Sequence, residues 1–217
     1  MIRNLRILGL TMVAMLAVGV VGASAASAAS FHSESSETFV LGSQSTQNVF
    51  TVNSRTFKCS TVTFTGSFEG TSKSTLEEIH PEYGGCEAFG LEIAINTEGC
   101  NYTFDEPSGS GSESHTGTVN LVCATGHEIE MNTASGVCVV TVGSQSGLSS
   151  VTYTDEGSGS SRSVLVTANV SGISVDVSGS TLICGTNGTR SATYTGSVST
   201  KGYTSEAHTI RTGIWVE

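Results

Sequence analysis

The chain has 217 residues, of which 19 are acidic and 9 are lysine or arginine, so its formal net charge is −10. This charge argues against nucleic-acid binding, because nucleic-acid-binding surfaces carry clustered lysine and arginine. Serine (34), threonine (29) and glycine (26) make up about two fifths of the sequence, yet a hydrophobic content of 37% argues against a disordered chain. Neither a collagen-like glycine period nor a coiled-coil composition is present.

The first 28 residues have the three-part layout of a secretory signal peptide. Arg3 and Arg6 precede an uncharged apolar stretch, residues 7–21, and small residues follow at 22–29. An uncleaved membrane anchor is the alternative, but the apolar stretch is shorter than the roughly 20 residues that a spanning helix needs. We therefore predict cleavage near residue 28, a secreted protein with no membrane attachment after cleavage, and a mature chain with net charge −12.

The cysteine content predicts a disulfide-stabilised protein. An even number of cysteines in an exported chain is typical of disulfides, and no pair has the Cys-x-x-Cys spacing of a zinc or redox site. We therefore predict three disulfides and no metal site among the six cysteines, which are Cys59, Cys86, Cys100, Cys123, Cys138 and Cys184.

One disulfide follows from a predicted β-hairpin. Residues 100–104 and 119–123 both alternate apolar and polar side chains, and a polar Gly/Ser stretch separates them. An antiparallel register that places 104 opposite 119 also places Cys100 opposite Cys123. For the other four cysteines, Cys59–Cys86 and Cys138–Cys184 is the simplest pairing, although no local pattern requires it.

Alternating apolar residues recur along the mature chain and predict an all-β fold. The clearest runs are residues 91–96, 129–132, 164–170 and 173–177. The alternating apolar residues of the third run have even numbers and those of the fourth have odd numbers. This change across Gly172 indicates a bulge or tight turn. We expect an antiparallel β-sandwich of about 10–13 short strands, formed by one domain that spans residues 29–217.

Helical patterns are nearly absent from the mature chain. The best candidate runs from Ser74 to Glu82, where Ser74 is a suitable N-cap and Pro81 ends the helix. We expect at most two helical turns there.

Four segments resemble a family of small exported all-β proteins of actinobacteria. They are Tyr83-Gly-Gly-Cys-Glu-Ala-Phe-Gly90, Gly99-Cys-Asn-Tyr-Thr-Phe104, Cys138-Val-Val-Thr-Val-Gly-Ser-Gln-Ser-Gly-Leu148 and Ala168-Asn-Val-Ser-Gly-Ile173. The resemblance covers most of the mature chain and implies export and an all-β fold. It implies no activity and no functional residue.

No catalytic motif is present, so we assign no catalytic residue. The segment Gly143-Ser-Gln-Ser-Gly147 places Gln145 where the nucleophile of a serine hydrolase should stand. The chain has three aspartates for a catalytic triad, Asp105, Asp155 and Asp176. A hydrolase whose acidic residues come from separate strands is the alternative hypothesis.

The densest ionisable cluster is formed by Glu77, Glu78, His80 and Glu82. It lacks the His-Glu-x-x-His spacing of a zinc enzyme, and the chain has no Asp-x-Asp-x-Asp-Gly calcium loop. We interpret the cluster as a solvated turn and predict no metal and no cofactor.

Extracellular binding or a cell-surface structural role, without a catalytic centre, is the preferred functional hypothesis. The expected partner is a glycan or a protein, and an aromatic platform for glycans would draw on Trp215, Tyr203 and Tyr194. A second alternative is an inhibitor of secreted proteases that presents residues 84–89, around Cys86, as a rigid loop.

Overall fold

The structure is a computed structural model that describes residues 29–105, 107–108, 114–133 and 136–217. The predicted signal peptide, residues 1–28, lies outside these residues and stays a prediction. The elements, in chain order, are β1 (Phe31–Ser33), β2 (Glu37–Val52), β3 (Arg55–Glu69), β4 (Ser72–Lys73), β5 (Leu76–Ala88), β6 (Leu91–Asn96), β7 (Cys100–Phe104), β8 (Ser114–Cys123), β9 (Ile129–Thr133), β10 (Cys138–Val142), β11 (Gln145–Glu156), η1 (Gly159–Ser161), β12 (Ser163–Gly179), α1 (Thr181–Cys184), β13 (Gly188–Tyr203), β14 (Arg211–Thr212) and β15 (Ile214–Val216).

The predicted all-β fold is confirmed, and alternation explains why the strands form. In β10, for example, Cys138, Val140 and Val142 are buried while the residues between them are half-buried. Ile129 and Met131 of β9 are buried in the same way. Each strand therefore places one row of apolar side chains on a common side of the sheet.

The main sheet closes into an eight-stranded β-barrel, which corrects the expected β-sandwich. Most strands pair with the next strand in the chain, and β13 pairs with both β12 and β2 to complete the ring. Three positions in the wall are each shared by two shorter strands, namely β6 and β7, β8 and β9, and β10 and β11. Alternation identifies the buried face of a strand but not its neighbours, so the sequence did not distinguish a closed sheet from two packed sheets.

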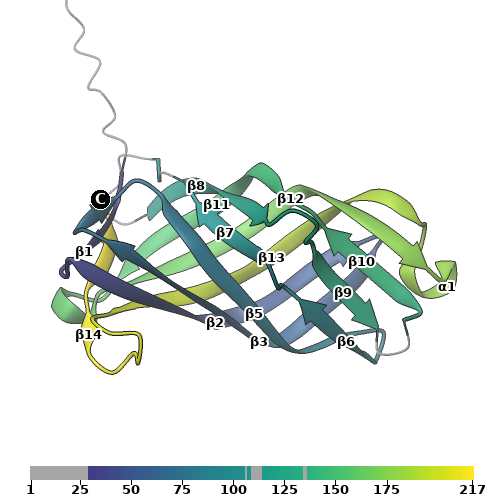
Figure 1. Cartoon of the computed structure of the whole chain (residues 1–217), viewed down its shortest axis with the longest axis horizontal. Helices are drawn as coiled ribbons and strands as arrows, with labels where there is room; N and C mark the ends of the chain where they lie inside the picture. The colour runs from purple at the N-terminus through teal and green to yellow at the C-terminus, as the bar shows by residue number, and fades with distance from the viewer. Residues whose placement is uncertain (1–28, 106, 109–113, 134–135) are drawn as a thin grey trace, which may run out of the picture.

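Several strands are much longer than expected. β2, β3, β5, β12 and β13 have 13 to 17 residues each, and they run along most of the barrel (Figure 1). Irregular registers interrupt them, such as the shift between Ser171 and Ile173 at Gly172, where a bulge was predicted. Bulges let a long strand bend around a closed barrel without ending.

The expected helix at residues 74–82 is wrong. Residues 76–82 of this segment belong to β5, where Ile79 and Pro81 are buried. Glu77, Glu78, His80 and Glu82 are exposed as expected, but they lie on this strand and not in a turn. Pairing with β3, which sets Phe64 opposite Pro81, outweighs the local capping signal at Ser74.

Three disulfides are present, in the pairs that the sequence suggested. Cys59 of β3 faces and bonds Cys86 of β5. Cys100 of β7 faces and bonds Cys123 of β8, and Phe104 lies opposite Val119, as the hairpin register requires. The third disulfide, Cys138–Cys184, ties β10 to α1 at one end of the barrel.

A small second sheet covers the other end of the barrel. It has the order β15–β1–β4, and Figure 1 places β1 and the C-terminus together at the end opposite α1. The backbone N–H of Glu217 donates to the carbonyl oxygen of Ser30 (3.0 Å), so the first and last described segments are paired. We call β1, β4 and β15 the end sheet.

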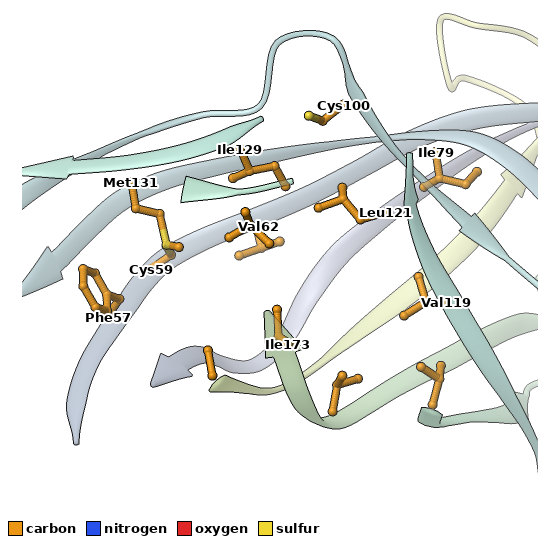
Figure 2. Packing of buried hydrophobic residues seen from close by; sticks show 14 of the residues in the cluster. Phe57, Cys59, Val62, Ile79, Cys100, Val119, Leu121, Ile129, Met131 and Ile173 are labelled. Atoms are coloured by element: carbon orange, nitrogen blue, oxygen red, sulfur yellow. The ribbon is translucent and has the colours of Figure 1, made fainter. Parts of the chain in front are cut away.

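The barrel interior holds the core. Figure 2 shows part of it, with Val62, Leu121 and Ile173 contributed by three different strands. Near the end sheet, the ring of Tyr153 packs edge-on against Phe31, with ring centroids 5.2 Å apart. No helix among the described residues is long and apolar enough to cross a membrane.

The disulfide at the α1 end gives a stability prediction. Replacing both Cys138 and Cys184 with alanine removes a cross-link over a sequence separation of 46 residues. We expect the free energy of unfolding to fall by about 4 kcal/mol, because the cross-link restricts the unfolded chain. Urea denaturation of the wild type and the double variant measures this change. Equal unfolding free energies would contradict the prediction.

Candidate functional site

The barrel encloses a cavity of about 170 Å³. Its lining is almost entirely apolar and comes from strands all round the wall, including Phe64, Leu121, Val166 and Val198. Several of these side chains are only half-buried although they point into the barrel, as Phe64 and Val166 are. Their remaining accessible surface therefore faces the cavity.

The size and chemistry of the cavity limit what it can hold. An engineered apolar cavity of about 150 Å³ in another protein stays dry and binds benzene. A closed barrel of eight strands either fills its interior with side chains or holds one small ligand. The cavity here therefore has room for a molecule of about one ring.

Polar side chains interrupt the apolar lining at several places, which include His32, Gln145, Tyr153 and Thr200 as well as a group of four that lie close together. Tyr83 of β5, Tyr102 of β7, Tyr194 of β13 and Asn48 of β2 all face the cavity, and we call them the tyrosine cluster. The hydroxyls of Tyr83 and Tyr102 are 3.1 Å apart and share a hydrogen bond. The hydroxyl of Tyr194 donates to Oδ1 of Asn48. The hydroxyls of Tyr83 and Tyr194 also lie within hydrogen-bonding reach of each other, so the two pairs meet inside the barrel.

Local irregularities in the sheet place Asn48 in the interior. The register between β2 and β3 shifts between Ser43 and Asn48, and Asn48 then lies opposite Cys59. Its amide Nδ2 donates to Oε1 of Gln44 (2.9 Å). Gly196 of the neighbouring strand β13 provides the space, since a Cβ there would lie 2.2 Å from Oδ1 of Asn48.

The tyrosines pack against phenylalanine rings that hold them in place. The ring of Phe64 lies 6.4 Å from that of Tyr83 and 5.8 Å from that of Tyr102. Phe104 lies 6.4 Å from Tyr102 along the same wall. Each tyrosine thus has an apolar body in the core and a polar tip that needs a partner.

Burial raises the pKa values of the three phenols, so they stay protonated further into the alkaline range than an ordinary tyrosine does. Burial raises the pKa of Tyr83 well above its ordinary value, and the neighbouring Tyr102 and Tyr194 raise this pKa further. Burial also raises the pKa of Tyr102 and that of Tyr194. All three hydroxyls therefore keep their hydrogens at neutral pH and are available as hydrogen-bond donors.

A charged group fastens the end sheet over the barrel. The carboxylate of Asp155 accepts the backbone N–H of Val216 (3.0 Å) and lies 3.3 Å from the guanidinium of Arg162. Burial raises the pKa of Asp155, and the N–H of Val216 and the charge of Arg162 oppose this rise. Arg162 also covers the ring of Trp215, at 4.3 Å from its centroid.

The rings considered for a glycan platform do not come together. Trp215 stacks on His32 in the end sheet, with ring centroids 5.4 Å apart. Tyr203 packs against His208, whereas Tyr194 points into the barrel interior. The three rings therefore do not form one exposed surface.

Among the residues that the structure describes, no group of three or more His, Cys, Asp and Glu side chains is placed to hold a metal ion. Gln145, which occupies the nucleophile position of the hydrolase-like segment, bonds through its amide to the backbone of Ser174 in both directions. It joins β11 to β12 beside the bulge at Gly172.

The tyrosine cluster was not recognised in the sequence as a site. Tyr83 stood out only as part of a resemblance motif, Tyr102 as part of such a motif and of the predicted hairpin, and Tyr194 only as a possible surface ring. Alternation does predict that Tyr102 shares a face with Cys100 and Phe104. Alternation does not predict that Tyr194 contacts Asn48 inside the barrel, because the two residues are 146 positions apart in the sequence.

No protein-family model, curated protein or solved structure matches the chain. The resemblance to exported actinobacterial proteins therefore stays a prediction.

The bond between Tyr194 and Asn48 gives a second stability prediction. Replacing Tyr194 with phenylalanine leaves Oδ1 of Asn48 buried without this donor, which costs about 1–3 kcal/mol. We expect the free energy of unfolding to fall by that amount, as measured by chemical denaturation. Tyr203→Phe, outside the barrel, is the matched control and should change stability little. Equal losses in the two variants would contradict the prediction.

The raised tyrosine pKa values predict a loss of stability at alkaline pH. The unfolded chain loses its phenol protons near pH 10, whereas the buried phenols of the folded protein keep theirs. Above pH 10 the folded state therefore binds more protons, and the free energy of unfolding falls by about 1.4 kcal/mol per pH unit for each such tyrosine. Denaturation curves between pH 9 and about pH 12 measure this slope. Replacing Tyr83, Tyr102 and Tyr194 with phenylalanine should reduce it, and an unchanged slope would contradict the burial of these hydroxyls.

Proposed function

We propose that this protein is an exported binding protein that holds one small, largely apolar molecule inside its β-barrel. The observation that carries this proposal is the 170 Å³ apolar cavity with a few hydrogen-bonding groups on its wall. Binding sites for small molecules are typically concave and apolar, with a few well-placed polar groups that orient the ligand.

Export is supported by the cysteine chemistry and by the sequence of the first 28 residues. All six cysteines are joined in disulfides, and such bonds persist in oxidising compartments. A secreted location is the natural interpretation of both features.

Binding is favoured over the alternative of a hydrolase. Paired carboxylates would have to converge on a common space, and the described residues that line the cavity include no aspartate or glutamate. The polar side chains that line it are tyrosines, Asn48, Gln145, Thr200, His32 and Trp215. The phenols and amides among them suit recognition better than proton transfer at neutral pH.

Protease inhibition is disfavoured by the place of residues 84–89. Gly84 pairs with Thr61 of β3, and Cys86 pairs with both Cys59 and Ile93, so most of the segment lies within the barrel wall. Only Phe89, at the tip of the hairpin between β5 and β6, is an exposed large apolar residue (45%). The segment is therefore not a protruding loop of the kind that enters a protease active site.

Small hydrocarbons test the proposal directly. Toluene and methylcyclohexane should bind the mature protein and raise its melting temperature, because a ligand that binds only the folded state stabilises it in proportion to RT ln(1 + [L]/Kd). Isothermal titration calorimetry should give one site per chain.

A cavity-filling variant is the matched control for this experiment. Ala168 lines the cavity, so Ala168→Leu should reduce ligand affinity about 10-fold or more by occupying the space. Thr167→Leu places the same side chain at the adjacent position, which does not line the cavity, and it should bind like the wild type. If no hydrocarbon binds the wild type, or if both variants bind equally well, the proposal is wrong.

A further inference from the structure

A fourth tyrosine, at the end-sheet side of the cavity, has a hydroxyl that the protein does not pair. Tyr153 of β11 lines the cavity and is almost completely buried (1% exposed). Its hydroxyl oxygen has no hydrogen-bond partner among the described residues. The tyrosine cluster differs, because its three hydroxyls can donate in a chain that ends on Asn48. The cluster therefore satisfies its own donors, and the unused donor belongs to Tyr153.

The groups packed around Tyr153 leave this donor unpaired. Phe31 of the end sheet and Phe104 of β7 pack edge-on against its ring, with ring centroids 5.2 and 6.4 Å away. Burial and, to a smaller extent, the carboxylate of Asp105 raise the pKa of Tyr153, so its hydroxyl keeps its hydrogen at neutral pH. That carboxylate accepts hydrogen bonds from two side chains of β8 instead. A buried donor in such surroundings costs free energy until an acceptor pairs with it.

The ring of Tyr153 leans against the barrel wall at a glycine. A Cβ on Gly117 of β8 would lie 2.7 Å from Cε2 of this ring and 3.1 Å from its hydroxyl oxygen. The oxygen is enclosed in this position, whereas the residue as a whole lines the cavity. A small rotation of the ring away from Gly117 would therefore bring the hydroxyl to the cavity, and pairing with an acceptor there would offset the cost of the movement.

A ligand with an acceptor oxygen can pair this donor, and a pure hydrocarbon cannot. Sites built to hydrogen-bond a polar group of the ligand discriminate against analogues that lack the group, because the buried protein group is then left unpaired. The size of the cavity limits the rest of the ligand to about one ring.

We infer that the barrel selects a ring-sized apolar molecule bearing one carbonyl oxygen, which points toward the end sheet and accepts a hydrogen bond from the hydroxyl of Tyr153. This inference rests on the proposed function, since it specifies which small molecule the cavity prefers. Tyr153 determines specificity, and the apolar wall supplies most of the affinity.

The stability of the ligand-free protein tests whether the donor is unused. Tyr153→Phe removes a hydroxyl that has no partner, so its melting temperature should equal or exceed that of the wild type. Tyr194→Phe removes a hydroxyl that bonds Asn48, so its melting temperature should fall. An equal fall in both variants would mean that the protein itself pairs the hydroxyl of Tyr153, and would overturn the inference.

Cyclohexanone and methylcyclohexane form the test pair of ligands, because they have the same number of non-hydrogen atoms and differ chiefly in the carbonyl group. Affinities are measured by calorimetry for the wild type, for Tyr153→Phe and for the control Tyr203→Phe, which lies outside the cavity. Tyr153→Phe should weaken cyclohexanone binding roughly 3- to 10-fold, the equivalent of one hydrogen bond, while leaving methylcyclohexane binding unchanged or tighter. Tyr203→Phe should change neither affinity.

Infrared spectroscopy gives a readout that a purely structural role would not change. The carbonyl stretching band of cyclohexanone bound to the wild type should lie at lower frequency than in an alkane solvent. This shift should be lost in Tyr153→Phe and kept in Tyr102→Phe, which removes a hydroxyl of the tyrosine cluster. Near-ultraviolet circular dichroism establishes that each variant is folded before binding is measured.

The outcomes separate the inference from the proposed function. If both ligands bind and Tyr153→Phe affects them equally, or if the carbonyl shift survives in this variant, the inference is overturned while the binding function stands. If neither ligand binds the wild type, the binding function itself is overturned.

Discussion

The fold depends on one constraint, which is that β13 must pair along both of its edges. On one side it pairs with β12 from Gly188 to Lys201, and on the other it pairs with β2 from Ala192 to Tyr203. With both pairings made, the ring has no free edge, and the backbone groups of the long strands bond to one another. Closure also fixes the diameter of the barrel, so the side chains that point inward decide how much space remains.

The interior shows how that space is distributed. Beside two of the inward-pointing side chains the neighbouring strand provides a glycine: Gly196 of β13 lies against Asn48 of β2, and Gly117 of β8 lies against the ring of Tyr153 of β11. Elsewhere valines and phenylalanines leave part of the interior open, which is the cavity. The tyrosine cluster is expensive to bury, and its hydroxyls are retained there at the cost of unfavourable desolvation. That cost is easier to understand for a binding site than for a core that only has to be stable.

The sequence predicted the features that depend on neighbouring parts of the chain. The register of the β7–β8 hairpin, and with it the Cys100–Cys123 disulfide, followed from alternation over 24 residues of chain. The barrel and the tyrosine cluster depend on contacts between distant segments, such as the bond between Thr46 and Ser197, which are 151 residues apart. Alternation carries no information about such pairs. The helix expected at Ser74 failed for a related reason, since pairing with β3 overrides a local capping signal.

The distance in sequence between β2 and β13 has a consequence for how the chain folds. β2 is complete early in synthesis, yet its second neighbour is almost the last strand to emerge, so one edge of the growing sheet stays unpaired until then. Two chains that meet at this stage can each supply the other's final strand. Exchange of β13, β14 and β15 would produce an interlocked dimer in which every pairing of the monomer is preserved, and the concentration of nascent chains would decide how much of it forms.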